Sequence, residues 1–550
     1  MHQLGYVSAN PVFEIAGLRF YMQVFTSENY YEPDPDKAEV VSENAKLELL
    51  CGGLIWAGGQ ERAQGSVSLQ AEKAEDSVRF RIRAEHAAEP IRRIKLALPD
   101  IRTGKVAGLR SPEPGQALRE VPEEGMILNY PDGWVQLFTP LLVLAHDDGS
   151  YTYFRCLDGE VRPKTFALFP AGDRLTVELL FEEKATRFGK SMEVPVWEVG
   201  TTNSYEAIMD NQRRWMERAY GLEPWEHRRD MPEWARHLSL VASVHGQHWT
   251  GYIYNTYDQM LEKLKWLAER IEPRRVLAYL PGWEGRYYFQ FGDLRPDPRM
   301  GGEEGFARLI DGAKRLGMRV MPMFMINGAN PRTEGFASWG EPSIYQSAGG
   351  YRQNWGSCDW DTSRHYGHNT GHGLNPGAPA WQDRLVGQVN ALIDRYGFDG
   401  VFMDLAAVYV NDPRYDTHQG MLDVVRRIRD RHPDVLMAGE GWFDATSTAF
   451  PYVQPALTAS GPAGDSLHHD SPYPPIFDTY NREFGHLGTG DPARGSTGVF
   501  EFGYNFRTQR MPLRKGVIPT VTIVDDTIDS APGKVEEILA DARRYAELYL

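Results

Sequence analysis

Hydrophobic and polar positions alternate through the first third of the chain. The alternation is clear in SVSLQAEKAEDSVRFRIRAE (66–85) and in DRLTVELLFEEK (173–184). Turn-forming stretches such as HDDGSY and FPAGDR separate these short runs, as expected for β-strands. The pattern predicts an N-terminal β-sandwich domain over residues 1–198.

The periodicity changes near residue 200. The stretch TTNSYEAIMDNQRRWMERAYGL has capping residues in front, helix formers inside and Gly221 at its end. It predicts a linking helix, and we assign residues 199–234 to a helical linker.

Apolar runs alternate with amphipathic helices over residues 235–550, which we expect to be the catalytic domain. Such alternation is typical of a parallel sheet covered by helices on both faces. Six strands are predicted, at 238–244, 275–280, 318–324, 400–404, 435–440 and 520–524. Strands 6 and 7 of the series are expected near 455–460 and within 475–503. About eight units favour a (β/α)8 TIM barrel, so the fold class is a multidomain β plus α/β protein.

The bulk composition narrows the function. Of the 550 residues, 59 are basic and 75 acidic, which gives a net charge of −16 and argues against nucleic acid or an anionic membrane as a partner. No signal peptide or membrane span is visible. The three cysteines match neither a disulfide framework nor a zinc motif. We therefore expect a cytoplasmic protein, and the sequence sets no oligomeric state.

Two of the predicted strands end in an acid. The run GFDGVFMDLA places Asp404 at the end of strand 4, and VLMAGEGW places Glu440 at the end of strand 5. The C-terminal ends of barrel strands form the active face, and neighbouring strands lie about 4.8 Å apart. Two carboxyls placed there can reach the separation used by retaining glycosidases. A cap for the next helix and an ion pair with a barrel arginine are the structural alternatives for the two acids.

The segments YGFDGVFMD and MAGEGW resemble the α-amylase-type glycoside hydrolases and their relatives. The passage GDLRPDPRMGGEEGFARLIDGAKRLGMRVMPMFMINGANP also resembles that clan. A sandwich followed by a barrel is similar to the endo-α-N-acetylgalactosaminidases and the poorly characterised families near them. The resemblance covers residues 235–445. It implies an α-linked sugar substrate, with Asp404 as nucleophile and Glu440 as acid/base.

Further residues are expected around the barrel mouth, where aromatic faces stack on sugars and polar groups bind hydroxyls. The candidate substrate-binding residues are His245, His248, Trp249, Trp283, Glu284, Trp360, Asp361, Trp442 and Asp470, and Asp444 is expected beside them. The resemblance also implies that the loop residue Asn327 lies near the substrate. The long loop 325–375 also groups His365, His368 and His372, but their spacing matches no strong metal motif. We expect no metal and no cofactor.

The leading hypothesis is a retaining glycoside hydrolase that acts by double displacement. A second hypothesis keeps Asp404 as the nucleophile and assigns the role of the acid to Asp465 or Asp470 after strand 6, as in α-galactosidase-like and α-glucosidase-like barrels. A third is a non-catalytic carbohydrate-binding protein on a glycosidase scaffold. The sequence does not decide the sugar, the linkage, or exo against endo action.

Overall fold

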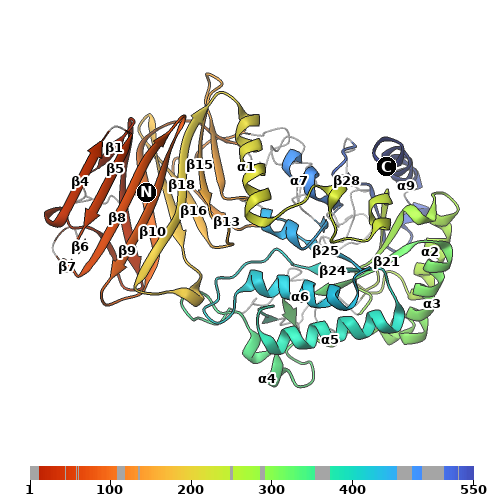
Figure 1. Ribbon diagram of the computed structural model, residues 1–550. Coiled ribbons are helices and arrows are strands. Elements are labelled where there is room, and N and C mark those ends of the chain that lie inside the picture. The colour runs from red at the N-terminus through yellow and green to blue at the C-terminus, as the bar shows by residue number, and fades with distance from the viewer. Residues whose placement is uncertain are drawn as a thin grey trace.

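The computed structural model shows a β-rich N-terminal part beside an α/β C-terminal part (Figure 1). It describes residues 12–43, 45–56, 59, 61–107, 118–133, 137–247, 252–284, 291–353, 372–454, 474–485, 513–530 and 532–550. No helix within these ranges is long and apolar enough to cross a membrane.

Two antiparallel sheets form the N-terminal part. The first runs in the order β13-β16-β17-β10-β2-β3-β6-β7, with β1 paired to β2, and the second in the order β12-β11-β14-β15-β18-β9-β8-β5-β4. The strands of the first sheet are β1 (Phe13–Ile15), β2 (Leu18–Thr26), β3 (Tyr30–Pro33), β6 (Leu54–Trp56), β7 (Glu61–Ala63), β10 (Ile91–Arg102), β13 (Met126–Tyr130), β16 (Lys164–Ala171) and β17 (Arg174–Glu182). Those of the second are β4 (Ala38–Glu43), β5 (Lys46–Cys51), β8 (Gly65–Ala74), β9 (Ser77–His86), β11 (Lys105–Ala107), β12 (Leu118–Arg119), β14 (Leu141–Ala145), β15 (Tyr151–Leu157) and β18 (Ser191–Thr202).

The two sheets share one hydrophobic core. Phe20 and Leu96 of the first sheet belong to the same buried cluster as Leu69 and Phe154 of the second. Alternation along each strand produces this arrangement, because every second side chain points to the same face. In β9, for example, buried and exposed residues alternate almost without exception.

The C-terminal part is built on one parallel sheet in the order β28-β27-β26-β25-β24-β21-β20-β19-β29. Its strands are β19 (Leu240–Val244), β20 (Val276–Leu280), β21 (Arg319–Met325), β24 (Gly400–Asp404), β25 (Leu436–Glu440), β26 (Tyr452–Gln454), β27 (Arg482–Phe484), β28 (Val517–Ile518) and β29 (Thr520–Ile523). Strand β28 pairs with β27, and β29 pairs with β19. Both strands belong to the short segment 517–523, so the sheet curls into a nearly closed barrel. The predicted combination of N-terminal β-structure and a parallel barrel is therefore confirmed.

Helices surround this barrel, and the first of them lies between the barrel and the N-terminal sheets (Figure 1). The helices are α1 (Tyr205–Tyr220), α2 (Tyr257–Ala268), α3 (Gly302–Leu316), α4 (Phe336–Trp339), α5 (Pro379–Tyr396), α6 (Thr417–Arg431), α7 (Pro474–Tyr480), α8 (Thr527–Ser530) and α9 (Pro532–Tyr549). Local signals set their ends: Thr256 and Gln259 form a capping box before α2, and α5 starts at Pro379 and stops at Gly397, whose φ is 65°. Two further short strands, β22 (Gly328–Ala329) and β23 (His372–Gly373), pair outside the barrel.

The sequence placed two barrel strands only approximately. The sixth strand, β26, lies at Tyr452–Gln454, just before the expected 455–460, and the latter residues are outside the described ranges. The seventh, β27, lies at Arg482–Phe484, inside the expected interval. Both strands have three residues each, which is too short for a clear hydrophobic pattern.

The barrel strands have two differently packed faces. Phe402, Ala438 and Tyr452 belong to the cluster inside the barrel, whereas Val401 and Met403 belong to the cluster under the helices. Because strand side chains alternate, residues 404, 440 and 454 point inward with 402, 438 and 452. The last inward positions of three consecutive strands are thus polar.

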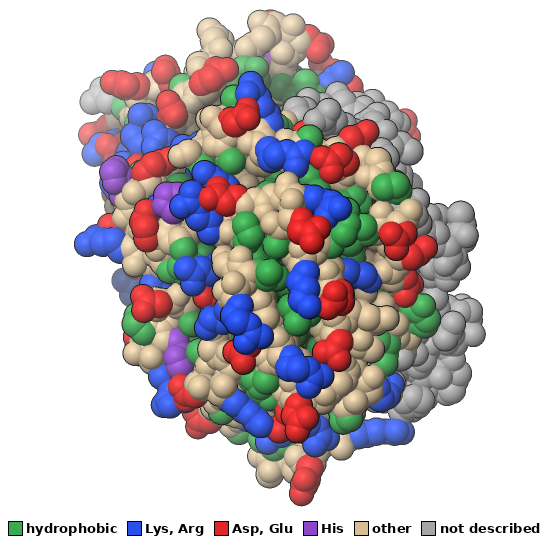
Figure 2. All heavy atoms as spheres, turned by 90° about the vertical axis from the view of Figure 1, so that its right-hand side faces the viewer, with side chains coloured by type: hydrophobic (Ala, Val, Ile, Leu, Met, Phe, Trp, Pro, Cys, Tyr) green, Lys and Arg blue, Asp and Glu red, His purple; other side chains and the backbone are tan. Residues whose placement is uncertain are grey.

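Charged side chains of both signs are interspersed over the face that carries α2, α3 and α9, and Figure 2 shows this mixture. Arg308 pairs with Asp258 across α2 and α3, and Arg543 pairs with Glu536 within α9. Such a mixture is typical of a solvated surface, and exposed pairs of this kind contribute little to stability.

Candidate active site

Asp404 and Glu440 lie at the ends of two hydrogen-bonded barrel strands. Met403 of β24 faces Gly439 of β25 in the parallel register, so the two acids are the next residues along each strand. Asp404 is 5% exposed, and Glu440 is partly exposed. The structure therefore brings the two predicted catalytic candidates together at the inner rim of the barrel.

The backbone of Leu405 lies between the two acids. Its N–H donates to Glu440 Oε2 over 2.9 Å, and its carbonyl accepts from Asn327 Nδ2 over 2.9 Å. Leu405 has a φ of 56°, in the left-handed region that a leucine rarely adopts. A strained turn held from both sides immediately after an inward-facing acid is typical of functional sites.

Asn327 and His245 both lie on the rim with buried side chains. The Asn327 side chain is held by its bond to the Leu405 carbonyl. The Asn327 backbone carbonyl accepts from the backbone N–H of Leu374 over 2.7 Å. The backbone N–H of His245 donates to the Ile523 carbonyl over 3.1 Å, and the imidazole ring of His245 lies edge-on to Tyr254. His245 directly follows β19, and its backbone bond to Ile523 continues the pairing of β19 with β29.

Two predicted aromatic residues do not face the barrel mouth. Trp283 is fully buried, stacks on Phe306 of α3 and donates its indole N–H to the Met323 carbonyl over 2.8 Å. Trp442 is also fully buried and packs between Phe138 of the N-terminal part and Phe477 of α7. Both hold structural layers together. Glu284, next to Trp283, is fully buried.

Replacing Trp283 with phenylalanine is expected to cost about 1–3 kcal/mol of unfolding free energy, because the Met323 carbonyl loses its buried donor. The Michaelis constant should change less than about twofold if the side chain never meets substrate. Urea unfolding and steady-state kinetics test this pair of expectations. A raised Michaelis constant at unchanged stability would instead place Trp283 in contact with the substrate.

Gln454 is a rim residue that the sequence reading missed. It ends β26 with an inward-facing, buried side chain, and its Nε2 donates to the Gly485 carbonyl over 2.8 Å. Register places it directly opposite Glu440. The signal was present, since PYVQ is a third apolar run that ends in a polar residue, but the strand was expected a few positions later.

Several predicted positions lie outside the described residues: His248, Trp249, Trp360, Asp361, Asp470, and with them Asp465, His365 and His368. Their roles stay predictions. Within the described ranges, no group of three or more His, Cys, Asp or Glu side chains is placed to hold a metal ion.

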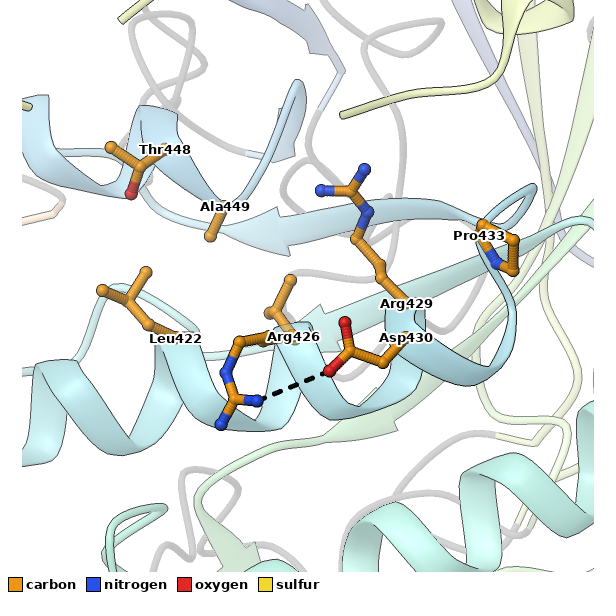
Figure 3. Close-up of a pocket in the computed structure, with 8 residues that line it drawn as sticks. Leu422, Arg426, Arg429, Asp430, Pro433, Thr448 and Ala449 are labelled. Carbon is orange, nitrogen blue, oxygen red and sulfur yellow. Dashed lines mark hydrogen bonds and ion pairs between the residues drawn. The ribbon is translucent and has the colours of Figure 1, made fainter. Parts of the chain in front are cut away.

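A pocket of about 440 Å³ lies on the outside of the barrel, between α6 and the turn 444–448 that follows β25. Figure 3 shows Arg429 reaching into it and Arg426 paired with Asp430 at its edge. Neither Asp404 nor Glu440 lines it. This pocket therefore does not serve the chemistry of the two acids.

Known proteins resemble this chain in sequence over one part of its length and in fold over nearly all of it. A protein-family model, described as a domain of unknown function (DUF6259), matches residues 195–421. Among solved structures, an α-N-acetylgalactosaminidase from Bifidobacterium bifidum in complex with GalNAc aligns over 98% of this chain and 93% of its own, with a TM-score of 0.67 and 12% identity.

A GH36 α-galactosidase from Geobacillus stearothermophilus in complex with raffinose aligns over 99% of this chain and 80% of its own, with a TM-score of 0.56 and 11% identity. The galactosidase domain of an α-galactosidase–sucrose kinase aligns over 97% and 72%, with a TM-score of 0.54 and 14% identity. The chain thus shares its whole architecture, sheets and barrel together, with these glycoside hydrolases.

Proposed function

We propose that this protein is a retaining glycoside hydrolase that acts on an α-linked galactose or N-acetylgalactosamine residue. The observation that carries the proposal is the pair of inward-facing carboxyls, Asp404 and Glu440, at the C-terminal ends of adjacent barrel strands. The sugar class comes from the solved structures of the same architecture, which are named as α-galactosidases and an α-N-acetylgalactosaminidase.

The chemistry follows from the placement of the two acids. Adjacent strands are about 4.8 Å apart, which suits the roughly 5–5.5 Å carboxyl separation of retaining enzymes. Asp404 attacks the anomeric carbon while Glu440 protonates the departing glycosidic oxygen. Glu440 then takes a proton from water, and the hydroxide displaces Asp404 from the same face that the leaving group occupied.

The surroundings of the two acids suit these roles. The Leu405 N–H donates to Glu440 Oε2 and so fixes the orientation of this carboxyl at the rim. Asp404 lies deeper, with 5% of its surface exposed, where water competes less with the sugar for the carboxylate. The environments of the two carboxyls differ, as a nucleophile and an acid require.

The test is a panel of 4-nitrophenyl glycosides followed by the anomer of the product. The wild-type protein is expected to cleave the α-galactoside or the α-N-acetylgalactosaminide and to leave the β-galactoside intact. Proton NMR during the first turnovers should show the α-anomer before mutarotation, as retention demands. Initial release of the β-anomer would show inversion and remove the double displacement, and cleavage of the β-glycoside alone would overturn the substrate class.

A further inference from the structure

A buried hydrogen-bond cluster joins the N-terminal part to the turn after Glu440. The Asp444 carboxyl is fully buried and accepts from Tyr130 Oη over 2.7 Å, from Thr139 Oγ1 over 2.8 Å and from the Ala445 N–H over 2.8 Å. Asp444 lies four residues beyond Glu440. Its donors Tyr130 and Thr139 come from the end of β13 and from just before β14.

The helix α1 closes this cluster from the other side. Gln212 Nε2 donates to Thr139 Oγ1 over 2.6 Å, and the Tyr220 hydroxyl lies 3.3 Å from that of Tyr130. Burial raises the pKa of Asp444 to about 6, while the bonds from Tyr130 and Thr139 oppose that rise. A buried carboxyl is costly unless it is hydrogen-bonded, so loss of the Tyr130 or Thr139 donor should destabilise this arrangement.

Main-chain contacts extend the connection to both loops that follow the acids. The Asp444 N–H donates to the Phe138 carbonyl over 2.7 Å, and the Trp442 N–H donates to the Gly133 carbonyl over 2.9 Å. A Cβ on Gly133 would lie 2.4 Å from the Ala407 Cβ, so only glycine permits this approach to the loop after Asp404. The Ala407 N–H in turn donates to the Glu440 carbonyl over 3.0 Å.

A second contact holds the loop after Asp404 farther along. Asn411 donates to Glu182 Oε1 over 2.6 Å and to the Glu183 carbonyl over 3.0 Å, and its Oδ1 accepts from the Ala185 N–H over 2.7 Å. Lys184 pairs with Asp416 over 2.6 Å at the start of α6. The N-terminal part therefore contacts both loops. It binds the loop after Glu440 through the Asp444 side chain and through backbone hydrogen bonds, and the loop after Asp404 through the side chains of Asn411 and Asp416.

We propose that Asp444 is a positioning residue, through which Tyr130 and Thr139 of the N-terminal part fix the backbone that carries Glu440 and the turn at Leu405. The inference deepens the proposed function and rests on it for its catalytic consequence. Catalytic groups must be held to within about 0.5 Å, and a 1 Å displacement can cost about a hundredfold in rate. The cluster supplies that constraint from outside the barrel.

The decisive variants are Tyr130→Phe, which removes one donor and little volume, and Asp444→Asn, which keeps the shape of the side chain. Asp34→Asn is the matched control, because Asp34 is a fully buried carboxyl in the N-terminal part that binds Arg62 and caps a turn far from the barrel. Both cluster variants should lower kcat by about tenfold to a hundredfold with the Michaelis constant near that of the wild type. The control should lose stability without this loss of kcat.

Hydrogen exchange separates this proposal from the function itself. Peptides covering 401–416 and 436–447 should exchange faster in Tyr130→Phe and Asp444→Asn than in the wild type, and at the wild-type rate in Asp34→Asn. Unchanged exchange in the cluster variants, or a kcat that simply follows stability in all three, would overturn the positioning role. If the wild type cleaves no glycoside, the proposed function fails, and the exchange rates still decide whether the cluster holds the loops.

Discussion

Asp404→Asn is expected to lower kcat on the responsive aryl α-glycoside by about 10⁴-fold or more, the largest single effect in the molecule. An amide cannot form the glycosyl ester, so the first displacement has no nucleophile. Asparagine matches aspartate in shape, and the buried site should keep its packing. Steady-state kinetics measures the loss, and thermal unfolding checks that the variant is folded.

Asp434→Asn is the matched control for this variant, because Asp434 is exposed and lies just before β25. It should keep wild-type activity. A folded Asp404→Asn variant with more than about a tenth of wild-type kcat would show that Asp404 is not the nucleophile.

Glu440→Gln is expected to lower kcat about 10²- to 10⁴-fold, the usual range for loss of a general acid and base. Aryl substrates with an acidic leaving group should still acylate the enzyme, because they need no proton to depart. Azide, which needs no base, should then restore turnover and yield the α-glycosyl azide. Azide added to Asp404→Asn should yield the β-anomer instead, because it attacks the substrate directly.

The anomers of the two azide products, read by NMR, assign the roles independently of the size of each rate loss. Azide should leave the wild-type rate nearly unchanged, which serves as the control. If Glu440→Gln retains most of its activity, Glu440 is not the acid. In that event Asp465→Asn and Asp470→Asn become the variants to make, since each alters an acid in the segment after strand 6.

The sequence predicted those parts of the barrel whose hydrophobic pattern is long enough to read. The run GVFMD coincides with β24, and VLMAGE differs from β25 by one residue. The apolar run PYVQ is too short to fix the position of β26, so the strand was expected a few residues later and Gln454 was not recognised as its last residue. Its place on the rim depends on register with β25, which is a long-range property.

The directions of side chains that follow a strand could not be predicted from the sequence either. Trp283 and Trp442 follow barrel strands and looked like mouth residues, but both turn outward into apolar layers. Position after a strand does not fix direction, because the chain leaves the sheet at Gly282 and Gly441 with φ of 69° and 76°. Asp444 also follows β25 and was expected at the mouth, but its buried carboxyl instead binds the N-terminal part. Its donors Tyr130 and Thr139 are more than 300 residues away along the chain, so this cluster could not be predicted from the sequence.

The approach of Gly133 to Ala407 has a consequence for biosynthesis. Domains generally fold in the order in which they leave the ribosome, so the two sheets can form before residues 405–448 are made. The later segment can then pack against sheets that are already folded. In this N-terminal part the Gly133 and Phe138 carbonyls are in place to accept hydrogen bonds from the backbone N–H groups of Trp442 and Asp444. We therefore expect the N-terminal part, when supplied as a separate chain, to improve the refolding yield of the barrel.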